Sequence, residues 1–363
     1  MTAPVRDAVS LGGNAPVMSP DTIRQVPDGV PARMLTYQEA IREALREEMR
    51  RDPSVFLMGE DIAKHGGAFG VTRTLFDEFG AERVRNTPIS ENTIVGAATG
   101  AALVGMRPVA EIMFVDFSGL AMDQIATQAA KIRFMTGGQC TVPWVLRMPQ
   151  GGGAGKSTAA QHSQSLEVWF AHIPGLKVVL PSTPYDARGL MKAAIRDDNP
   201  VVFLEQKLLY GFKGLVPEEE YVLPLSRCDV KREGSDVTIV ASGYMVWHAM
   251  LAAEILAPEG IGVEVVDVRT VSPLDEETIG ASARKTGRVV AVAEACRQYG
   301  PANEWAMVAM ERAWDQLKAP VLRVAGRDSP VPFANSIENG VWPSTDDVVA
   351  AVRSVMAGRA PGA

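Results

Sequence analysis

Residues 178–204 read VVLPSTPYDARGLMKAAIRDDNPVVFL, and this stretch holds two apolar runs of strand length with a helix-like segment between them. The runs Val178 to Leu180 and Val201 to Leu204 are apolar at every position, which is typical of strands buried on both faces. Pro184 indicates the start of the intervening helix, and Asn199-Pro200 indicates its end. A strand, a helix and a second strand in this order predict an α/β fold, in which helices cover both faces of a parallel sheet.

The same alternation extends outward in both directions. Toward the N-terminus, Thr36-Tyr37-Gln38-Glu39 is a capping-box sequence that predicts the start of a helix, and Asp52-Pro53 ends it. The other elements predicted in this half are strands at 55–58, 109–115 and 142–146 and a helix at 120–133. Toward the C-terminus, strands are predicted at 237–241, 263–268, 289–292 and 321–324, with helices centred near Ala252, Glu277, Val308 and Val349.

Two domains are expected, because 363 residues exceed what one hydrophobic core usually organises. Residues 205–234 have weak periodicity and several Gly and Pro, which is typical of an extended surface connection. The predicted order is a disordered Pro/Gly-rich lead at 1–33, a first α/β domain at 34–205, a linker at 206–235, a second α/β domain at 236–356 and a tail at 357–363.

Charge and cysteine content exclude several classes of protein. With 36 basic and 43 acidic side chains the formal net charge is −7, which argues against a nucleic-acid-binding surface and against a polybasic membrane anchor. No segment reaches transmembrane length, so the sequence predicts a cytoplasmic protein that binds neither nucleic acid nor membrane. Cys140, Cys228 and Cys296 are far apart and lack CxxC spacing, and we expect free thiols, not disulfides or a zinc site.

The segment Thr87-Pro88-Ile89-Ser90-Glu91 opens a predicted helix that contains Gly96, Gly100 and Gly105 among alanines. Glycines at these positions predict close packing of the helix on a neighbour. A carboxylate at the end of such a helix is expected at a buried interface, where desolvation makes it a better proton acceptor. The alternative is an ordinary acidic residue, which the helix dipole favours in a first turn.

The segment Gln161-His162-Ser163-Gln164 ends a glycine-rich loop. The loop resembles a phosphate-binding loop, but Gln150 stands where the motif GxxxxGK[ST] requires its first glycine. We therefore expect a loop that carries His162 near a substrate, with the side chains of Gln161, Ser163 and Gln164 available to orient the ring. No second histidine or carboxylate stands at metal-ligand spacing from it, and His172 and His248 are expected to be structural or on the surface.

Several motifs in sequence order resemble one family. They are residues 58–61 (MGED), 87–91 (TPISE), 111–117 (EIMFVDF), 123–125 (DQI), 161–164 (QHSQ), 174–179 (PGLKVV), 195–201 (IRDDNPV) and 272–275 (SPLD). From Met34 to Met356 the chain is similar to the β subunit of the decarboxylating component of 2-oxo acid dehydrogenase complexes. AHIPGLKVV, QKLLYG and SPLDEETI resemble the acetoin branch more than the pyruvate or branched-chain branches, which remain alternatives. A scaffold that kept the fold and lost catalysis is the non-enzymatic alternative.

The resemblance implies two transketolase-like domains, a pyrimidine-binding domain at 34–205 and a transketolase C-terminal domain at 236–356. It implies thiamine diphosphate as cofactor, shared with an α subunit that holds the diphosphate and Mg²⁺ through a GDG motif, which this chain lacks. The implied partners are that α subunit in an α2β2 heterotetramer, a lipoyl-bearing acyltransferase core and a small-molecule substrate.

The resemblance also implies roles for individual residues. Glu91 would hydrogen-bond to the aminopyrimidine ring of the cofactor, with Ile89 approaching from the same turn and Met113 and Phe117 packing on the ring. His162 would donate a proton to the departing lipoyl sulfur.

Two further implied features are less closely tied to the reaction. Glu60 matches an acidic position near the cofactor, on a proton path between paired sites, with a surface or helix-cap role as the alternative. The resemblance implies a structural K⁺ bound by Val142, Trp144, Val145, Ala194, Asp197 and Asn199. Departures from the family pattern at Asn92-Thr93 and Lys156-Ser157 bear on substrate preference.

Overall fold

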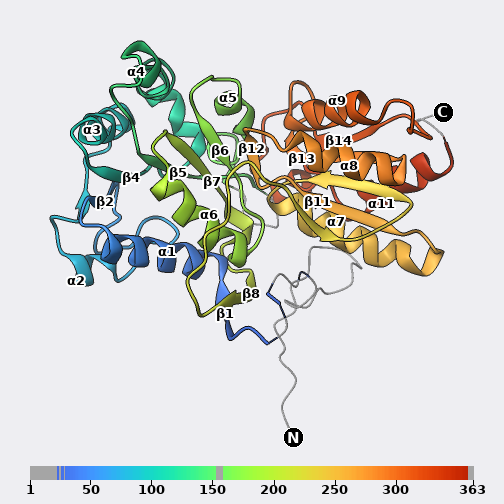
Figure 1. Cartoon of the computed structure of the whole chain (residues 1–363), viewed down its shortest axis with the longest axis horizontal. Coiled ribbons are helices and arrows are strands. Elements are labelled where there is room, and N and C mark those ends of the chain that lie inside the picture. The colour runs from blue at the N-terminus through green and yellow to red at the C-terminus, as the bar shows by residue number, and fades with distance from the viewer. Residues whose placement is uncertain (1–22, 24–25, 28, 153–157, 359–363) are drawn as a thin grey trace, which may run out of the picture.

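The computed structural model describes residues 23, 26–27, 29–152 and 158–358. Most of the predicted lead at 1–33 lies outside the described residues, as do the last residues of the tail and Lys156-Ser157. Two α/β domains lie side by side, one from the N-terminal half and one from the C-terminal half of the chain (Figure 1). No described helix combines the length and the apolar content that crossing a membrane requires. All three cysteines are free, as predicted.

The first domain is built on a seven-stranded sheet in the order β12-β6-β7-β5-β4-β2-β3. Strands β2 to β7 pair in parallel, and β12, which comes later in the chain, joins antiparallel to β6. The strands are β2 (Val55–Gly59), β3 (Val84–Asn86), β4 (Arg107–Glu111), β5 (Val145–Gln150), β6 (Lys177–Val179), β7 (Val201–Gln206) and β12 (Thr270–Ser272).

Helices cover both faces of this sheet because its strands are apolar on both faces. Along β7, Val201 and Phe203 join one buried cluster, whereas Val202 and Leu204 join another. The first face carries α1 (Tyr37–Arg51) and α6 (Pro184–Arg196), which pack on each other. The second face carries α3 (Glu91–Leu103), η2 (Val115–Ala121), η3 (Asp123–Ala129), α4 (Ala130–Met135) and α5 (Glu167–Ala171). The short helix α2 (Leu75–Phe79) precedes β3.

The second domain repeats the same layering on a five-stranded sheet in the order β14-β13-β10-β11-β9. Its strands are β9 (Asp229–Arg232), β10 (Val237–Ala241), β11 (Val263–Asp267), β13 (Val289–Cys296) and β14 (Leu322–Gly326), and only β9 is antiparallel. One face packs on α7 (Tyr244–Leu256) and α11 (Thr345–Met356) and the other on α8 (Glu276–Thr286) and α9 (Pro301–Ala313). Short helices are η5 (Ala257–Glu259) and α10 (Asn335–Glu338).

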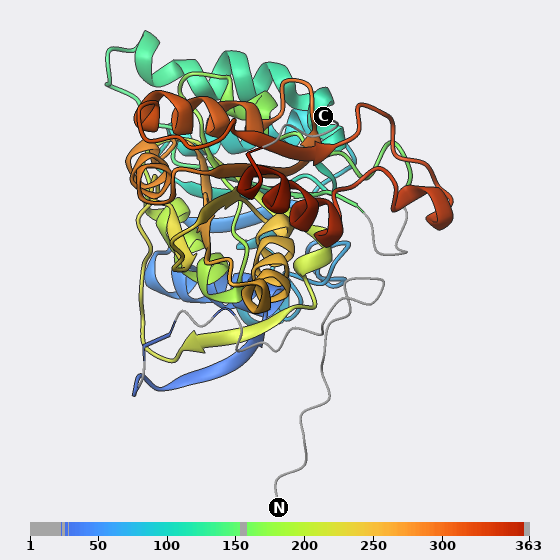
Figure 2. The same ribbon diagram turned by 90° about the vertical axis from the view of Figure 1, so that its right-hand side faces the viewer.

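One apolar cluster runs from the α1 and α6 layer of the first domain into α7 of the second. The ring of Phe212 lies 4.7 Å from the ring of Trp247 in α7, centroid to centroid, and fixes this junction. Residues 206–235, predicted as an extended linker, contain η4 (Lys207–Leu209), β8 (Lys213–Pro217) and the edge strand β9. Strand β8 pairs antiparallel with β1 (Ala32–Thr36) below the two domains, and Figure 2 shows this ribbon from the side.

Three sequence predictions are wrong in whole or in part, and all concern the segment from β4 to β5. The strand predicted at 109–115 ends at Glu111, after which the chain leaves the sheet. The helix predicted at 120–133 is divided into the 3₁₀ turn η2, the π-helical turn η3 and the short α4. π-Helical turns are common near functional sites. The strand predicted at 142–146 begins only at Val145, because Pro143 has no N–H to donate to a neighbouring strand.

Candidate active site

The candidate site lies at one edge of the seven-stranded sheet, where its parallel strands end. Glu60 directly follows β2, Met113 comes shortly after β4, and the loop with His162 follows β5. Glu91 is the first residue of α3, which begins soon after β3 ends. The carboxyl ends of parallel strands meet at one edge, so the fold brings these residues to one end of the first domain. Ligands of open α/β sheets usually bind at this edge.

Two carboxyl groups lie close together at this edge. Glu91 and Glu60 are 7% and 8% exposed. Burial raises the pKa of Glu60, and the nearby charge of Glu91 raises it further. No described residue hydrogen-bonds to Glu60 Oε1 or to the buried Thr87 Oγ1. Buried polar atoms without a partner are rare in native proteins and indicate a place for water or a ligand.

Apolar side chains lie on the segments next to this pair. Ile89 is 82% exposed, on the turn that leads into α3. Met113 and Phe117 are half-buried. Helix α3 packs against η2, which carries Phe117. An exposed isoleucine and two partly open side chains beside buried carboxyls are the composition of a ligand site with a polar group at its end.

The imidazole of His162 rests against two aromatic rings. Its centroid lies 4.7 Å from that of Phe114 and 5.1 Å from that of Phe117, and both pairs are nearly perpendicular at 81°. No described residue hydrogen-bonds to either ring nitrogen. Phe117 therefore connects the helix of Glu91 with His162, and among the described residues none occupies the ring nitrogens of His162.

No described hydrogen bond joins Ser163 or Gln164 to the ring of His162, although these side chains were expected to orient it. Gln164 donates its backbone N–H and side-chain amide to Asp116 Oδ1 at 3.3 and 2.9 Å. The hydroxyl of Ser163 lies 2.7 Å from Thr158 Oγ1. These contacts fasten the loop to η2 and to itself.

The predicted close packing of α3 is confirmed at one glycine only. A Cβ at Gly96 would meet the side chain of Gln124 at 3.2 Å. Gly100 and Gly105 have no neighbour within 4 Å of such an atom, so for them the prediction is wrong within this chain. Gly105 serves the backbone instead, because its φ of +93° is a conformation that favours glycine.

The chain matches two protein domain families. The transketolase pyrimidine-binding domain family matches residues 33–213, and the transketolase C-terminal domain family matches residues 226–348. The β-2 subunit of the mitochondrial pyruvate dehydrogenase E1 component of Oryza sativa subsp. japonica is 47% identical over 89% of this chain and 86% of its own length. The β subunit of 2-oxoisovalerate dehydrogenase of Bacillus subtilis is 47% identical over 89% and 98%.

The β subunit of acetoin:2,6-dichlorophenolindophenol oxidoreductase of Cupriavidus necator is 48% identical over 90% of this chain and 99% of its own length. The chain belongs to this family of dehydrogenase β subunits. Among solved structures, a split-gene transketolase described as an inactive β4 tetramer covers 92% of the chain with a TM-score of 0.71 and 27% identity. The two transketolase-like domains expected from the sequence are thereby confirmed.

Beneath the site, this β subunit contains a buried ionic network that the sequence analysis missed. Arg147 donates to both carboxylate oxygens of Glu205 at 2.6 and 2.8 Å and to Glu111 Oε2 at 2.5 Å. The hydroxyl of Tyr210 donates to Glu205 at 2.7 Å. The two carboxylates raise the pKa of Arg147, whereas burial raises the pKa of Glu111. Charged residues inside otherwise apolar strands were the available sequence signal.

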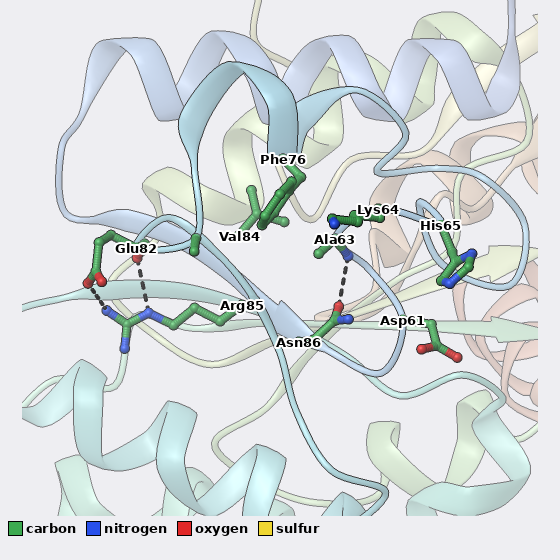
Figure 3. Close-up of a pocket in the computed structure, with 10 residues that line it drawn as sticks. Asp61, Ala63, Lys64, His65, Phe76, Glu82, Val84, Arg85 and Asn86 are labelled. Carbon is green, nitrogen blue, oxygen red and sulfur yellow. Dashed lines mark hydrogen bonds and ion pairs between the residues drawn. The ribbon is translucent and has the colours of Figure 1, made fainter.

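A separate pocket of the β subunit opens beside this edge (Figure 3). Asp61, Lys64, His65 and Asn86 are among its lining residues, whereas Glu91 and His162 are not. Asn86 points to the backbone of Ala63, and its Oδ1 accepts a hydrogen bond from Ala63 N–H at 2.8 Å. The loop that follows β2 forms one wall of this pocket, and neither carboxyl group of the pair lines it.

The predicted K⁺ ligands come together at the opposite edge of the sheet. The carbonyl oxygens of Val142, Trp144 and Ala194 already accept backbone N–H groups at 2.9, 3.0 and 3.3 Å. The carboxylate of Asp197 pairs with Lys177 and accepts two hydrogen bonds from Asn199. Each of these oxygens therefore accepts a hydrogen bond from within the chain. At Asp197 the positive charge next to the carboxylate is the ammonium of Lys177. A K⁺ site here stays a prediction.

Proposed function

We propose that this chain is the β subunit of a thiamine-diphosphate-dependent dehydrogenase that cleaves a 2-oxo acid or acetoin together with an α subunit. The observation that carries the proposal is the burial of Glu91 at the first turn of α3, beside Glu60 and at the carboxyl edge of the sheet. The similarity to dehydrogenase β subunits over about nine-tenths of the chain supports it.

The residues present fit one half of the cofactor. Ile89, Met113 and Phe117 offer apolar surface to an aminopyrimidine ring, and the unpartnered oxygens of Glu60 and Thr87 offer polar contacts at its end. When bound, thiamine diphosphate supplies a nucleophilic carbon that cleaves the bond beside a carbonyl group. The described residues hold no group of three or more His, Cys, Asp or Glu that could hold a metal ion, so we assign Mg²⁺ to the α subunit.

Each catalytic residue has a task that its surroundings suit. The buried carboxylate of Glu91 would share a proton with the ring nitrogen of the aminopyrimidine, since desolvation strengthens this hydrogen bond. The open ring nitrogens of His162 would donate a proton to a lipoyl sulfur as it leaves. Phe114 and Phe117 hold the ring in place without using either nitrogen.

We propose acetoin as the substrate, on the motifs that favour that branch, with pyruvate and a branched-chain 2-oxo acid as the alternatives. Relatives named for each of the three substrates are 47–48% identical to the chain, so identity does not separate them. The β subunit reconstituted with its α partner is assayed on acetoin, pyruvate and 3-methyl-2-oxobutanoate, with 2,6-dichlorophenolindophenol as electron acceptor. The substrate with the highest kcat/KM decides.

Large apolar side chains exposed on adjoining elements of the first domain support a partner surface. They belong to the end of α3, to η2 and to α4, and they are Leu103, Val104, Leu120, Phe134 and Met135. Exposed apolar groups in such number are typical of surfaces that another subunit covers. We propose that they take part in an α2β2 assembly, which delivers its product to a lipoyl-bearing acyltransferase.

The proposal predicts that Glu91→Gln lowers kcat of the reconstituted enzyme at least about hundredfold, because an amide cannot share the proton in the same way. The matched control is Glu304→Gln, which changes an exposed glutamate in the first turn of α9. Both changes remove a negative charge that interacts favourably with a helix dipole. A larger fall in kcat for Glu91→Gln than for Glu304→Gln therefore reports on the site and not on the helix. Unchanged activity of the assembled Glu91→Gln enzyme on all three substrates would support a scaffold without catalysis and would falsify the proposal.

A further inference from the structure

The side chain of Lys207 reaches the loop of His162 from the end of a neighbouring strand. Lys207 is the first residue of η4, directly after β7. Its ammonium donates to the carbonyl oxygen of His162 and to Thr158 Oγ1, the latter at 2.9 Å. Thr158 in turn donates to the same carbonyl oxygen at 2.9 Å. Two donors thus converge on the backbone of His162 itself.

The same ammonium lies 5.3 Å from the centroid of the Phe114 ring. This distance is within the range of cation–π attraction. Phe114 is also the ring nearest to His162, at 4.7 Å. Lys207 is therefore bound both to the backbone that carries the imidazole and to the aromatic surface against which the imidazole rests.

The loop needs such support because its backbone is strained. His162 N–H donates to the carbonyl oxygen of Ala159 at 3.3 Å and closes a tight turn. Ala159 has a φ of +59°, a left-handed conformation that costs about 1–2 kcal/mol for a residue with a Cβ. No described hydrogen bond holds the imidazole ring, so its direction depends on this turn and on the phenylalanines.

We propose that Lys207 is a positioning residue for His162. The protonated ammonium of Lys207 fixes the turn, and the turn presents the imidazole of His162 edge-on against Phe114 and Phe117. The placement of the ring is inferred from these contacts alone, and only its catalytic purpose rests on the proposed function. Burial lowers the pKa of Lys207 to about 8, although the negative charges of Asp116 on η2, Glu294 on β13 and Glu338 on α10 each raise it. The hold of the Lys207 ammonium on the turn is therefore expected to weaken as the pH rises through 8.

Histidine NMR on the full chain tests the placement without any partner or cofactor. The chain has four histidines, and His162→Gln assigns the signal. In the parent chain the ¹³Cε1 signal of His162 is expected to change with a midpoint near pH 8. Lys207→Met should abolish this step and give the narrow line of a mobile ring at every pH, whereas Lys207→Arg should keep the ordered line up to pH 9, because a guanidinium does not titrate there.

Glu294 requires a separate control, because burial raises its pKa to about 8 as well and it accepts a hydrogen bond from Gly152 N–H in the same loop at 3.2 Å. A step near pH 8 that persists in Lys207→Arg belongs to Glu294 and overturns the assignment. Lys131→Met, which removes a lysine-to-carbonyl hydrogen bond at Pro174, should leave the His162 signal unchanged. If Lys207→Met does not fold, Thr158→Val removes the second donor and should also mobilise the ring.

An activity measurement distinguishes this inference from the proposed function. In the reconstituted enzyme, Lys207→Met should slow the acylation of a lipoyl domain about tenfold to hundredfold, with rescue by Lys207→Arg. If the NMR results hold and the lipoyl rate does not change, Lys207 positions the ring but His162 has another role. If the line of His162 is the same in the parent chain and in Lys207→Met, the positioning role is wrong whatever the enzyme does.

Discussion

Glu60 is a buried carboxyl group next to another carboxyl group. It is 8% exposed, no described residue hydrogen-bonds to its Oε1, and Glu91 lies near enough to raise its pKa. A buried anion without a compensating partner destabilises the folded chain. Such an arrangement is typical of functional sites, where stability is lower than the fold would allow.

Replacing this group should therefore stabilise the free chain. We expect Glu60→Gln to increase the free energy of unfolding by about 0.5–2 kcal/mol near pH 8. The folded-state pKa of Glu60 is raised above its ordinary value of 4.5, so near this pH the folded chain binds more protons than the unfolded chain. The destabilisation that ionised Glu60 causes therefore grows as the pH rises from 4.5 through the folded-state pKa. The free energies of unfolding of the parent and the variant should converge toward pH 4. Urea unfolding at both pH values measures the difference.

The control for Glu60 is Glu82→Gln, which changes an exposed glutamate that pairs with Arg85. It should alter stability by less than about 1 kcal/mol at either pH. Equal stability of the parent and Glu60→Gln near pH 8 would show that Glu60 has a partner in solution.

At the scale of residues, local patterns predicted some placements and could not predict others. Glu91 was recognised because its neighbours along the chain form a motif at a helix start, and it is buried there. Lys207 was missed because the carbonyl oxygen that it contacts is 45 residues away in sequence. Arg147 and Glu205 are 58 residues apart. Such pairs depend on strand order, which no local pattern contains.

At the scale of elements, capping signals and apolar runs gave bounds that the structure confirms. Thr36 forms the predicted capping box at the start of α1, and Ser344 forms a second capping box at the start of α11. Strand β10 has the predicted bounds 237–241. The predictions fail between β4 and β5, where residues after Glu111 leave the sheet to carry Met113 and Phe117 over its edge. An apolar run is read as a strand whether it lies in a sheet or lines a site.

The contact between α7 and α11 includes a buried histidine, and burial favours its neutral form. His248 was expected to be structural or at the surface, and it is buried, with Nδ1 2.8 Å from Thr345 Oγ1. Burial lowers its pKa to about 4. Since the unfolded chain titrates near 6.5, the stability from His248 is present above pH 6.5 and is lost as the pH falls toward 4.

We expect this one group to account for a loss of about 3 kcal/mol between pH 6.5 and pH 4. His248→Asn keeps a polar atom near Thr345 but does not titrate, so its free energy of unfolding should fall less steeply over that range. His65→Asn, at an exposed histidine, should follow the parent curve. Parallel curves for the parent and His248→Asn in urea unfolding from pH 4 to 7 would contradict the buried neutral histidine.

At the scale of the whole molecule, a buried ion cluster joins the two domains. Lys231 Nζ on β9 lies 2.6 Å from Asp186 Oδ2 on α6 and 3.3 Å from Asp267 Oδ2 on β11, and all three side chains are inaccessible to solvent. Arg269 adds a contact of 3.1 Å to Asp186. The cations lower the pKa of Asp186 to about 2, while burial raises the pKa of Asp267 to about 6. The cluster and the shared apolar core fix how the domains meet.

Removing the ammonium of Lys231 should lower the free energy of unfolding more than removing a charge at the surface does. Lys231→Met leaves two buried carboxyls together, and we expect a loss of about 3–5 kcal/mol in the free energy of unfolding near pH 8. The loss should be smaller near pH 5, because the folded-state pKa of Asp267 lies above its unfolded value and the proton it binds then removes the repulsion. The control is Lys285→Met, which removes a half-exposed ammonium that also contacts two carboxylates and should lower the free energy of unfolding by at most about 1 kcal/mol.

Thermal unfolding by circular dichroism at both pH values measures these losses of stability. If Lys231→Met loses no more than Lys285→Met, the apolar core alone holds the domains together.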